Sequence, residues 1–203
     1  MFTNNPYAQG GWYNPENPMS INTRVSASYV PSVFGSLPVL ESGTGERSLT
    51  FQLIPNKPDI LNSSIMAPTG NPCIQITSNY NSAPCTYFRK CDGTVLAYIE
   101  WSNRPMVCIP GILEKVYVSR WLVLSPDRRS RTMVARDRPL IWVPKDNQIA
   151  LFAIGSTFQE PLATVSKNKT LVTLKLTTEA VNAGLLEAGI VATVLLQSGR
   201  NID

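Results

Sequence analysis

About eleven short runs of alternating apolar and polar residues follow one another between residues 47 and 177. In "RSLTFQLI" (47–54), Leu49, Phe51 and Leu53 occupy every second position, and this period places them on one face of a β-strand. The other runs share a high content of Val, Ile, Thr, Tyr and Trp, which favours strands. They span residues 73–79, 85–90, 94–101, 106–109, 115–125, 131–137, 140–144, 149–155, 162–167 and 170–177.

Tight turns separate several of these runs. "CDGT" (91–94) is typical of a two-residue hairpin turn, because Asp-Gly tolerates positive φ angles. "SPDRR" (125–129) places Pro and Asp in turn positions. Many short strands joined by tight turns are typical of a β-barrel or a β-sandwich. The sequence therefore predicts a mainly β domain.

Residues 1–45 differ in composition from the rest of the chain. They contain five prolines among many Asn, Gly and Ser residues, and proline both fixes φ and removes a backbone donor. We expect a flexible or surface-draped N-terminal arm over residues 1–45, without regular structure, and one folded domain over residues 46–203. A second irregular piece is expected over residues 55–72.

The segment "LTTEAVNAGLLEAGIVATVLLQSGR" (176–200) contains the longest apolar stretch of the chain. Thr177 or Thr178 can cap a helix that Gly199 ends, so we expect a helix at about 178–198. The alternatives are a membrane anchor, a partner-binding helix and a helix buried in the domain. Glu187 lies near the middle and opposes an anchor, because a charge at the bilayer centre is costly. Apolar residues on all sides favour a buried helix, which fits inside a closed barrel.

Composition excludes several kinds of chemistry. The chain has no histidine, which removes the commonest general base and the Ser-His and Cys-His nucleophile systems. Its cysteines form no CxxC pair, which gives a zinc site little support. The first residues do not resemble a secretory signal, so free thiols are favoured over two disulfides. No carboxylate pair and no phosphate-loop motif is present. We therefore expect no catalytic residues, no metal and no cofactor. The cysteines are Cys73, Cys85, Cys91 and Cys108.

One stretch, "DRRSRTMVARDRP" (127–139), concentrates basic side chains. Guanidinium groups bind phosphate through paired hydrogen bonds, so this stretch is the candidate site for an anion or a phospholipid headgroup. The alternative is a solvated turn that Asp127 and Asp137 partly neutralise. Residues 71–203 carry fifteen basic and ten acidic side chains, a net +5, which is too small an excess to indicate nucleic acid. The candidate residues are Arg128, Arg129, Arg131, Arg136 and Arg138.

The segments "YFRKCDGTVLAYIEW" (87–101) and "SRWLVLSPDRRSRTMVARDRPLIW" (119–142), with the apolar C-terminal helix, resemble the fungal domain-of-unknown-function family 6593, which is common in mushrooms. That family is distantly similar to the Tubby C-terminal, LURP-one-related and phospholipid scramblase barrels. The resemblance implies a closed antiparallel β-barrel of about twelve strands around a central hydrophobic C-terminal α-helix. The chain departs from the pattern at Arg138-Pro139, where an Asp-Gly turn is expected. The matching features are Asp92-Gly93, Ala97 to Trp101, Trp121-Leu122 and Trp142.

These features together predict a non-enzymatic binding or scaffold module, since the Tubby-like folds include phosphoinositide binders. We expect it inside the cell, in the cytoplasm or at the periphery of an anionic membrane, because the first residues do not resemble a secretory signal. The alternative is a carrier of a small apolar ligand, or a protein-interaction module that uses the N-terminal arm. A histidine-free hydrolase is the remote alternative. No nucleic-acid partner is expected.

Overall fold

The computed structural model describes residues 29–31, 38–40, 48–56, 59–81, 83–155, 160–168 and 171–203. The chain divides into two units, residues 1–45 and 46–203. In the first unit, strands β1 (Tyr29–Pro31) and β2 (Pro38–Leu40) pair antiparallel. The expectation that residues 1–45 lack regular structure is therefore wrong for these two strands. The remainder of the predicted arm lies outside the described residues.

The second unit contains one antiparallel sheet of 13 strands in the order β10-β11-β12-β13-β14-β15-β3-β4-β5-β6-β7-β8-β9. Neighbours in the sheet are also neighbours in the chain, except that β15 pairs with β3. The strands of this sheet are β3 (Ser48–Pro55), β4 (Ser63–Met66), β5 (Pro72–Asn79), β6 (Cys85–Lys90), β7 (Val95–Glu100), β8 (Met106–Ile109), β9 (Leu113–Tyr117), β10 (Val123–Leu124), β11 (Arg131–Ala135), β12 (Arg138–Lys145), β13 (Gln148–Ala153), β14 (Ala163–Lys167) and β15 (Val172–Thr177).

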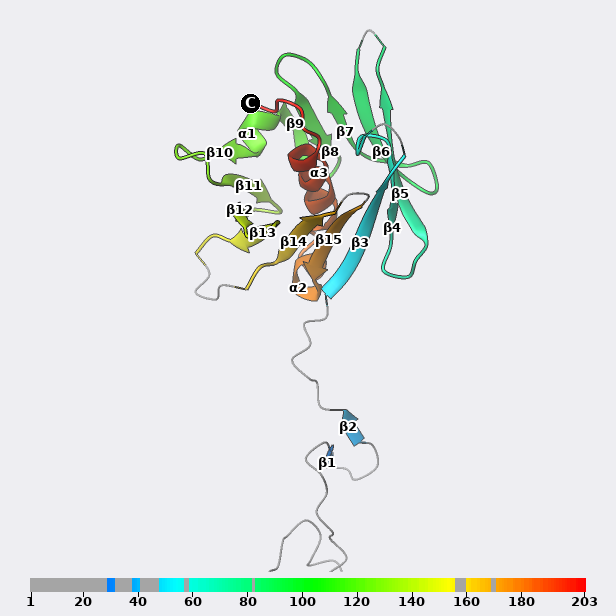
Figure 1. Cartoon of the computed structure of the whole chain (residues 1–203), viewed down its shortest axis with the longest axis vertical. Helices are drawn as coiled ribbons and strands as arrows, with labels where there is room; N and C mark the ends of the chain where they lie inside the picture. The colour runs from blue at the N-terminus through cyan, green and yellow to red at the C-terminus, as the bar shows by residue number, and fades with distance from the viewer. Residues whose placement is uncertain are drawn as a thin grey trace, which may run out of the picture. The chain divides into compact units, whose positions relative to one another are not determined.

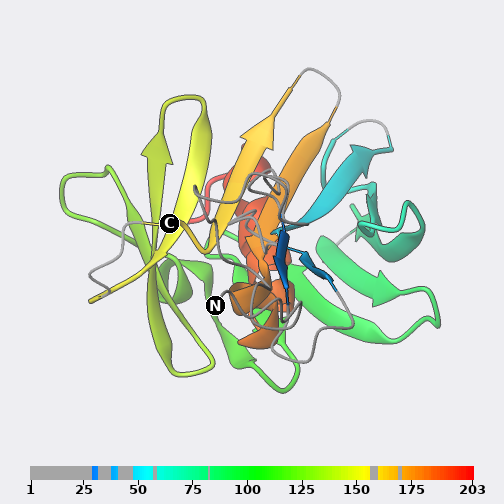
Figure 2. The same cartoon turned by 90° about the horizontal axis from the view of Figure 1, so that it is seen from below.

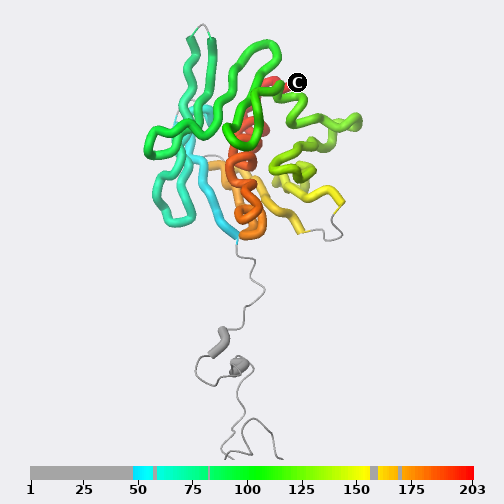
Figure 3. Tube along the Cα trace, turned by 180° about the vertical axis from the view of Figure 1, so that it is seen from behind, coloured from blue at the N-terminus to red at the C-terminus, as the bar shows by residue number. Residues whose placement is uncertain are grey.

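The predicted closed barrel of about twelve strands is wrong, because the sheet has two edges. The terminal strands β9 and β10 do not pair with each other. Figure 1 labels them on either side of α1, and Figure 3 shows this green part of the trace from behind. Helix α1 (Val118–Trp121) connects them, so residues 115–125 do not form the single strand that their composition predicts. The Trp121 indole N–H donates to the Val134 carbonyl (3.1 Å) and fixes this helical turn. A tertiary contact here overrides β-propensity.

Most alternating runs form strands with the predicted burial. In β3, Phe51 and Leu53 are buried while Gln52 between them is exposed. The expectation of an irregular segment over residues 55–72 is wrong for β4, whose Ser63 and Ile65 are buried. Ser63 donates to the Ile60 carbonyl (2.9 Å), so a buried polar side chain is satisfied by the preceding turn.

The predicted helix at 178–198 is two short helices, α2 (Thr178–Asn182) and α3 (Leu186–Gln197). Gly184 adopts φ +72°, and its N–H donates to the Val181 carbonyl while the Leu185 N–H donates to the Ala180 carbonyl. These two hydrogen bonds form a Schellman motif, which ends α2. The prediction of a central helix inside a barrel is therefore wrong in length and in setting.

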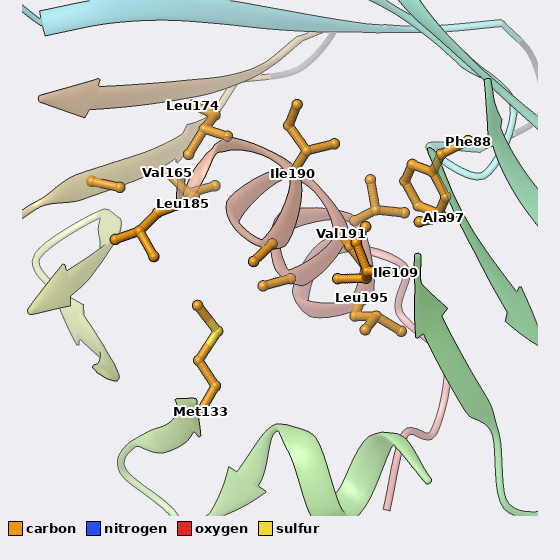
Figure 4. Close-up of a cluster of buried hydrophobic side chains, with 14 of the residues drawn as sticks. Phe88, Ala97, Ile109, Met133, Val165, Leu174, Leu185, Ile190, Val191 and Leu195 are labelled. Atoms are coloured by element: carbon orange, nitrogen blue, oxygen red, sulfur yellow. The ribbon is translucent and has the colours of Figure 1, made fainter. Parts of the chain in front are cut away.

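Helix α3 packs on the inner face of the curved sheet (Figures 1 and 2). It contacts β15 and β7, which are separated by four strands in the sheet order, so the sheet must curve for one helix to reach both. Residues 188–195 are all buried. Ile190, Val191 and Leu195 pack among side chains that include Phe88 and Leu174 (Figure 4). The inner faces of the strands pack on this core, and their outer faces point away from it.

Candidate functional site

The five predicted site arginines do not form one cluster. Arg128 and Arg129 lie in the loop between β10 and β11, whereas Arg136 and Arg138 flank the turn between β11 and β12. Strand β11 separates the two groups by its five residues, or about 17 Å at 3.4 Å per residue. Arg131 begins that strand. These arginines are close in sequence, but in the structure they lie at opposite ends of β11.

Arg131 stabilises the fold and is not free to bind an anion. Its guanidinium donates to both carboxylate oxygens of Asp203 (2.8 and 2.6 Å) and to the Leu122 carbonyl (2.8 Å). Its side chain is 14% exposed, against 46% for Asp203. The hydrogen bond from Arg131 lowers the pKa of the Asp203 carboxyl. This pair fastens the segment after α3 to β11.

Arg136 is also committed in part. It occupies the two-residue β11–β12 turn, where it has φ +52° and Asp137 has φ +58°. Its guanidinium Nη1 donates to the Gly111 carbonyl (3.3 Å) in the segment before β9. Glycine and asparagine favour this conformation, and an arginine adopts it at some cost. The contact between Arg136 and Gly111 bridges the two edges of the sheet.

Arg128 and Arg129 project from an ordered loop. Asp127 accepts hydrogen bonds from the Ser125 hydroxyl and from the Arg129 N–H, and these donors lower the pKa of its carboxyl. Both arginine side chains are exposed and make no ion pair with any described residue. They border a hollow of about 120 Å³ whose apolar wall includes Trp142, Ile149 and Leu196.

An apolar surface that sequence reasoning missed covers the outer face of β11–β13. Val134 pairs with Pro139, whose carbonyl accepts from the Ile154 N–H (3.0 Å), so these three residues form one cross-strand row. Thr132, Ile141 and Phe152 form the next row. Val134 is 56% exposed and Ile154 is 48% exposed. We call this surface the apolar outer face; its residues are Val134, Pro139, Ile141, Val143, Phe152 and Ile154.

The sequence did contain a signal for this surface. In "LIWVP" (140–144) and "IALFAI" (149–154) both alternating positions are apolar, so one apolar set faces the core and the other faces outward. Leu140, Trp142 and Leu151 are buried in the core, while Ile141 and Phe152 lie outside it and are partly exposed. Loss of alternation in an antiparallel strand therefore indicated a second apolar face.

A cleft lies where the sheet fails to close. Its cavity of about 440 Å³ is lined by β9, α1, β10 and β11, and we call it the seam. Val123 and Val134, which are 45% and 56% exposed, line it together with Trp121. The charged lining residues are Arg120, Arg136 and Asp137. The seam therefore has both apolar and cationic walls.

Other candidate chemistry finds little support among the described residues. No three His, Cys, Asp or Glu side chains gather there as metal ligands, and Cys73, Cys85, Cys91 and Cys108 are all free thiols. Burial raises the pKa of the Cys73 thiol, with a contribution from nearby Cys91, which disfavours the reactive thiolate. None of the helices in the described segments is long and apolar enough to cross a bilayer.

Comparison with known proteins gives no family assignment. No family model matches the chain, and no curated protein matches it. Among solved structures, the chain is similar to an X-ray structure of a protein from Arabidopsis thaliana, with 11% sequence identity and a TM-score of 0.40. The match covers 72% of this chain and 92% of that one. A TM-score of this size does not establish a shared fold, so the resemblance to the fungal family stays a prediction.

Proposed function

We propose that this protein is a non-enzymatic binding module that docks on anionic lipid surfaces through the apolar outer face and the basic residues at its border. The observation that carries the proposal is the pair of mainly apolar rows on the outside of β11–β13, with Val134 and Ile154 about half exposed. A contiguous exposed apolar patch costs solubility and usually marks an interaction surface.

The charges around this face favour an anionic partner. Arg138 is exposed at the start of β12 and makes no ion pair among the described residues, and Lys145 is exposed at the other end of that strand. Asp137 and Asp146 lie in the two adjoining turns and offset part of this charge. Arginine and lysine beside an apolar patch bind headgroups while the apolar side chains enter the interface.

The predicted hairpin does not place its arginines on this face. The Arg136 guanidinium turns to the Gly111 carbonyl, and Arg138 pairs with buried Ala135, so its Cβ lies on the core-facing side of β12. Lys145 alternates with Ile141 and is an exposed cation on the apolar outer face. A basic residue near an anionic membrane contributes about 1 kcal/mol, and that attraction falls off within a Debye length. Two or three such residues give weak binding alone, so the apolar contact is required.

Flotation with vesicles tests the proposal. We expect the protein to float with vesicles that contain phosphatidylserine and not with phosphatidylcholine vesicles at low salt. Lys145→Glu removes one attraction and adds one repulsion, which amounts to about 2 kcal/mol or roughly 30-fold in affinity. Ile154→Asp should weaken flotation at least as much, because it places a carboxylate in the apolar contact.

Ile54→Asp is the matched control. Ile54 is 41% exposed, similar to Ile154, but it lies in β3, three strands from β13 in the sheet order. It should leave flotation unchanged. The proposal fails if wild-type protein ignores anionic vesicles at low salt, or if the two aspartate variants weaken flotation equally.

A further inference from the structure

Strand β9 is an open edge of the sheet along its whole length. The Val118 N–H donates to the Pro105 carbonyl (2.9 Å), and pairs in an antiparallel ladder alternate between hydrogen-bonded and non-hydrogen-bonded. The register pairs Tyr117 with Met106 and Val116 with Val107. The backbone groups of Val116 therefore face β8, and those of Tyr117 face the seam. The register shifts between Val107 and Ile109, so this alternation is not extended to Glu114 and Lys115.

The opposite wall of the seam is also incompletely paired. β10 covers only Thr132 and Arg131 of β11, so the edge beyond them has no strand partner among the described elements. The Val134 carbonyl points into the seam, because it accepts the Trp121 indole N–H. The Val134 N–H points the same way, since both groups of one strand residue face one edge. Unpaired edges of this kind pair readily with another extended chain.

The side chains of the seam specify what kind of chain would fit. Val123 and Val134 give it an exposed apolar wall. Arg136 reaches the Gly111 carbonyl just before β9, and Arg120 follows β9 in α1. The two cations thus lie near the two ends of β9, a span of about 17 Å at 3.4 Å per residue.

We infer that the seam binds an extended peptide segment that pairs with the edge of β9 and carries two acidic side chains four residues apart. Residues i and i+4 of a strand lie on one face about 14 Å apart, so the two carboxylates meet Arg120 and Arg136. An apolar side chain at i+2 contacts Val123 and Val134. Strand addition of this type takes affinity from main-chain hydrogen bonds and specificity from alternate side chains.

This inference does not rest on the lipid-docking proposal. Val134 borders both surfaces, but the peptide is recognised through the unpaired edges and Arg120. Asp137 also lines the seam and leaves a net excess of one positive charge among the lining residues. The Arg120 guanidinium lies 5.7 Å from the Tyr117 ring centroid and forms no ion pair with a described carboxylate. It is therefore available to a carboxylate of the partner.

The probe is the capped heptapeptide Thr-Glu-Thr-Leu-Thr-Glu-Thr, with amide hydrogen exchange as the readout. In the free protein, the amide of Tyr117 should exchange faster than that of Val116. Saturating peptide should slow the exchange of the Tyr117 amide by about tenfold or more, while that of Val116 changes little. A peptide with both glutamates replaced by lysine should not bind. Two further peptides are N-methylated, one at the odd-numbered amides and one at the even-numbered amides. One of these two should lose at least tenfold in affinity, because only one set of amides pairs with β9.

Two variants locate the peptide. Arg120→Glu should lower peptide affinity about tenfold or more, since one charge-assisted hydrogen bond is lost, and its exposed position preserves the fold, as an unchanged melting curve would show. Arg138→Glu, outside the seam, should not affect the peptide. Unchanged exchange at Tyr117, or full affinity of both N-methylated peptides, overturns the inference. Binding of dodecanoate without binding of the peptide also overturns it and makes the seam a small-ligand pocket.

Discussion

The guanidinium of Arg131 makes three hydrogen bonds, two to the Asp203 carboxylate and one to the Leu122 carbonyl. Arg129, two residues earlier, is exposed and has no ion pair among the described residues. Identical side chains two positions apart thus differ in role, because β11 turns one toward the C-terminal segment and the loop turns the other to solvent. Sequence shows the chemistry of both residues but not their partners.

This difference predicts unequal effects of the two substitutions on the free energy of unfolding. Arg131→Ser should lower the free energy of unfolding by about 1–2 kcal/mol, discounted for the half-exposed Asp203 partner. Arg129→Ser should change it by less than about 0.5 kcal/mol. Urea denaturation of the two variants measures both values. Equal destabilisation would contradict the structural role of Arg131.

The same ion pair gives a pH dependence with a defined sign. Because Arg131 lowers the pKa of Asp203 in the folded state, its contribution is complete well above the ordinary carboxyl pKa of about 3.9. It is lost as the pH falls through the lowered folded-state value. The stability gap between wild type and Arg131→Ser should therefore shrink in urea titrations below about pH 3. A gap that grows on acidification would show that the pair is not the cause.

At the scale of elements, two glycines in the C-terminal segment have opposite requirements. Gly184 has φ +72°, and a Cβ there would lie 3.3 Å from the Arg136 Nε. Gly189 lies within α3, where a Cβ would meet Leu176 at an ordinary 3.6 Å. Glycine is required at position 184, because the chain adopts a positive φ where α2 ends. Glycine at position 189 only lowers the helix propensity of α3.

Alanine at each position should separate these cases. Gly184→Ala should destabilise the protein by about 1–2 kcal/mol, since an L-residue is strained at that φ. Gly189→Ala should stabilise it by about 0.5–1 kcal/mol, because alanine has the higher helix propensity and space is available. Thermal unfolding curves would show one transition shifted down and one shifted up. Destabilisation by both would mean that the space beside Gly189 is closed.

Alternation predicted most strands because each buried face must repeat every second residue. Two elements escaped it for physical reasons. The helical turn α1 depends on the hydrogen bond from Trp121 to Val134, which is not encoded in the local pattern. The division at Gly184 did have a local signal, Ala183-Gly184 after a helix-forming run, but uniform apolar character over 185–196 suggested one long helix.

At the scale of the whole molecule, the sheet departs most from prediction at its ends. Pairing of β9 with β10 would have closed it, but α1 occupies the connection and leaves the seam. Apart from the open edges, strands β11–β13 have one face on the core and one apolar face outward. The arginines of "DRRSRTMVARDRP" were predicted as one site, and the hairpin divides them between the two ends of β11.

Docking through the apolar outer face is the central claim, and a fluorescent label at position 154 tests it most directly. The exposed and half-exposed thiols Cys73, Cys91 and Cys108 are replaced by serine, and Ile154→Cys or Ile54→Cys is labelled with an environment-sensitive dye. On phosphatidylserine vesicles, the emission of the label at position 154 should increase and shift to the blue. The emission of the label at position 54 should stay unchanged, because that label remains in water. Equal responses at both positions, or none at 154 while the protein is bound, would contradict docking through this face.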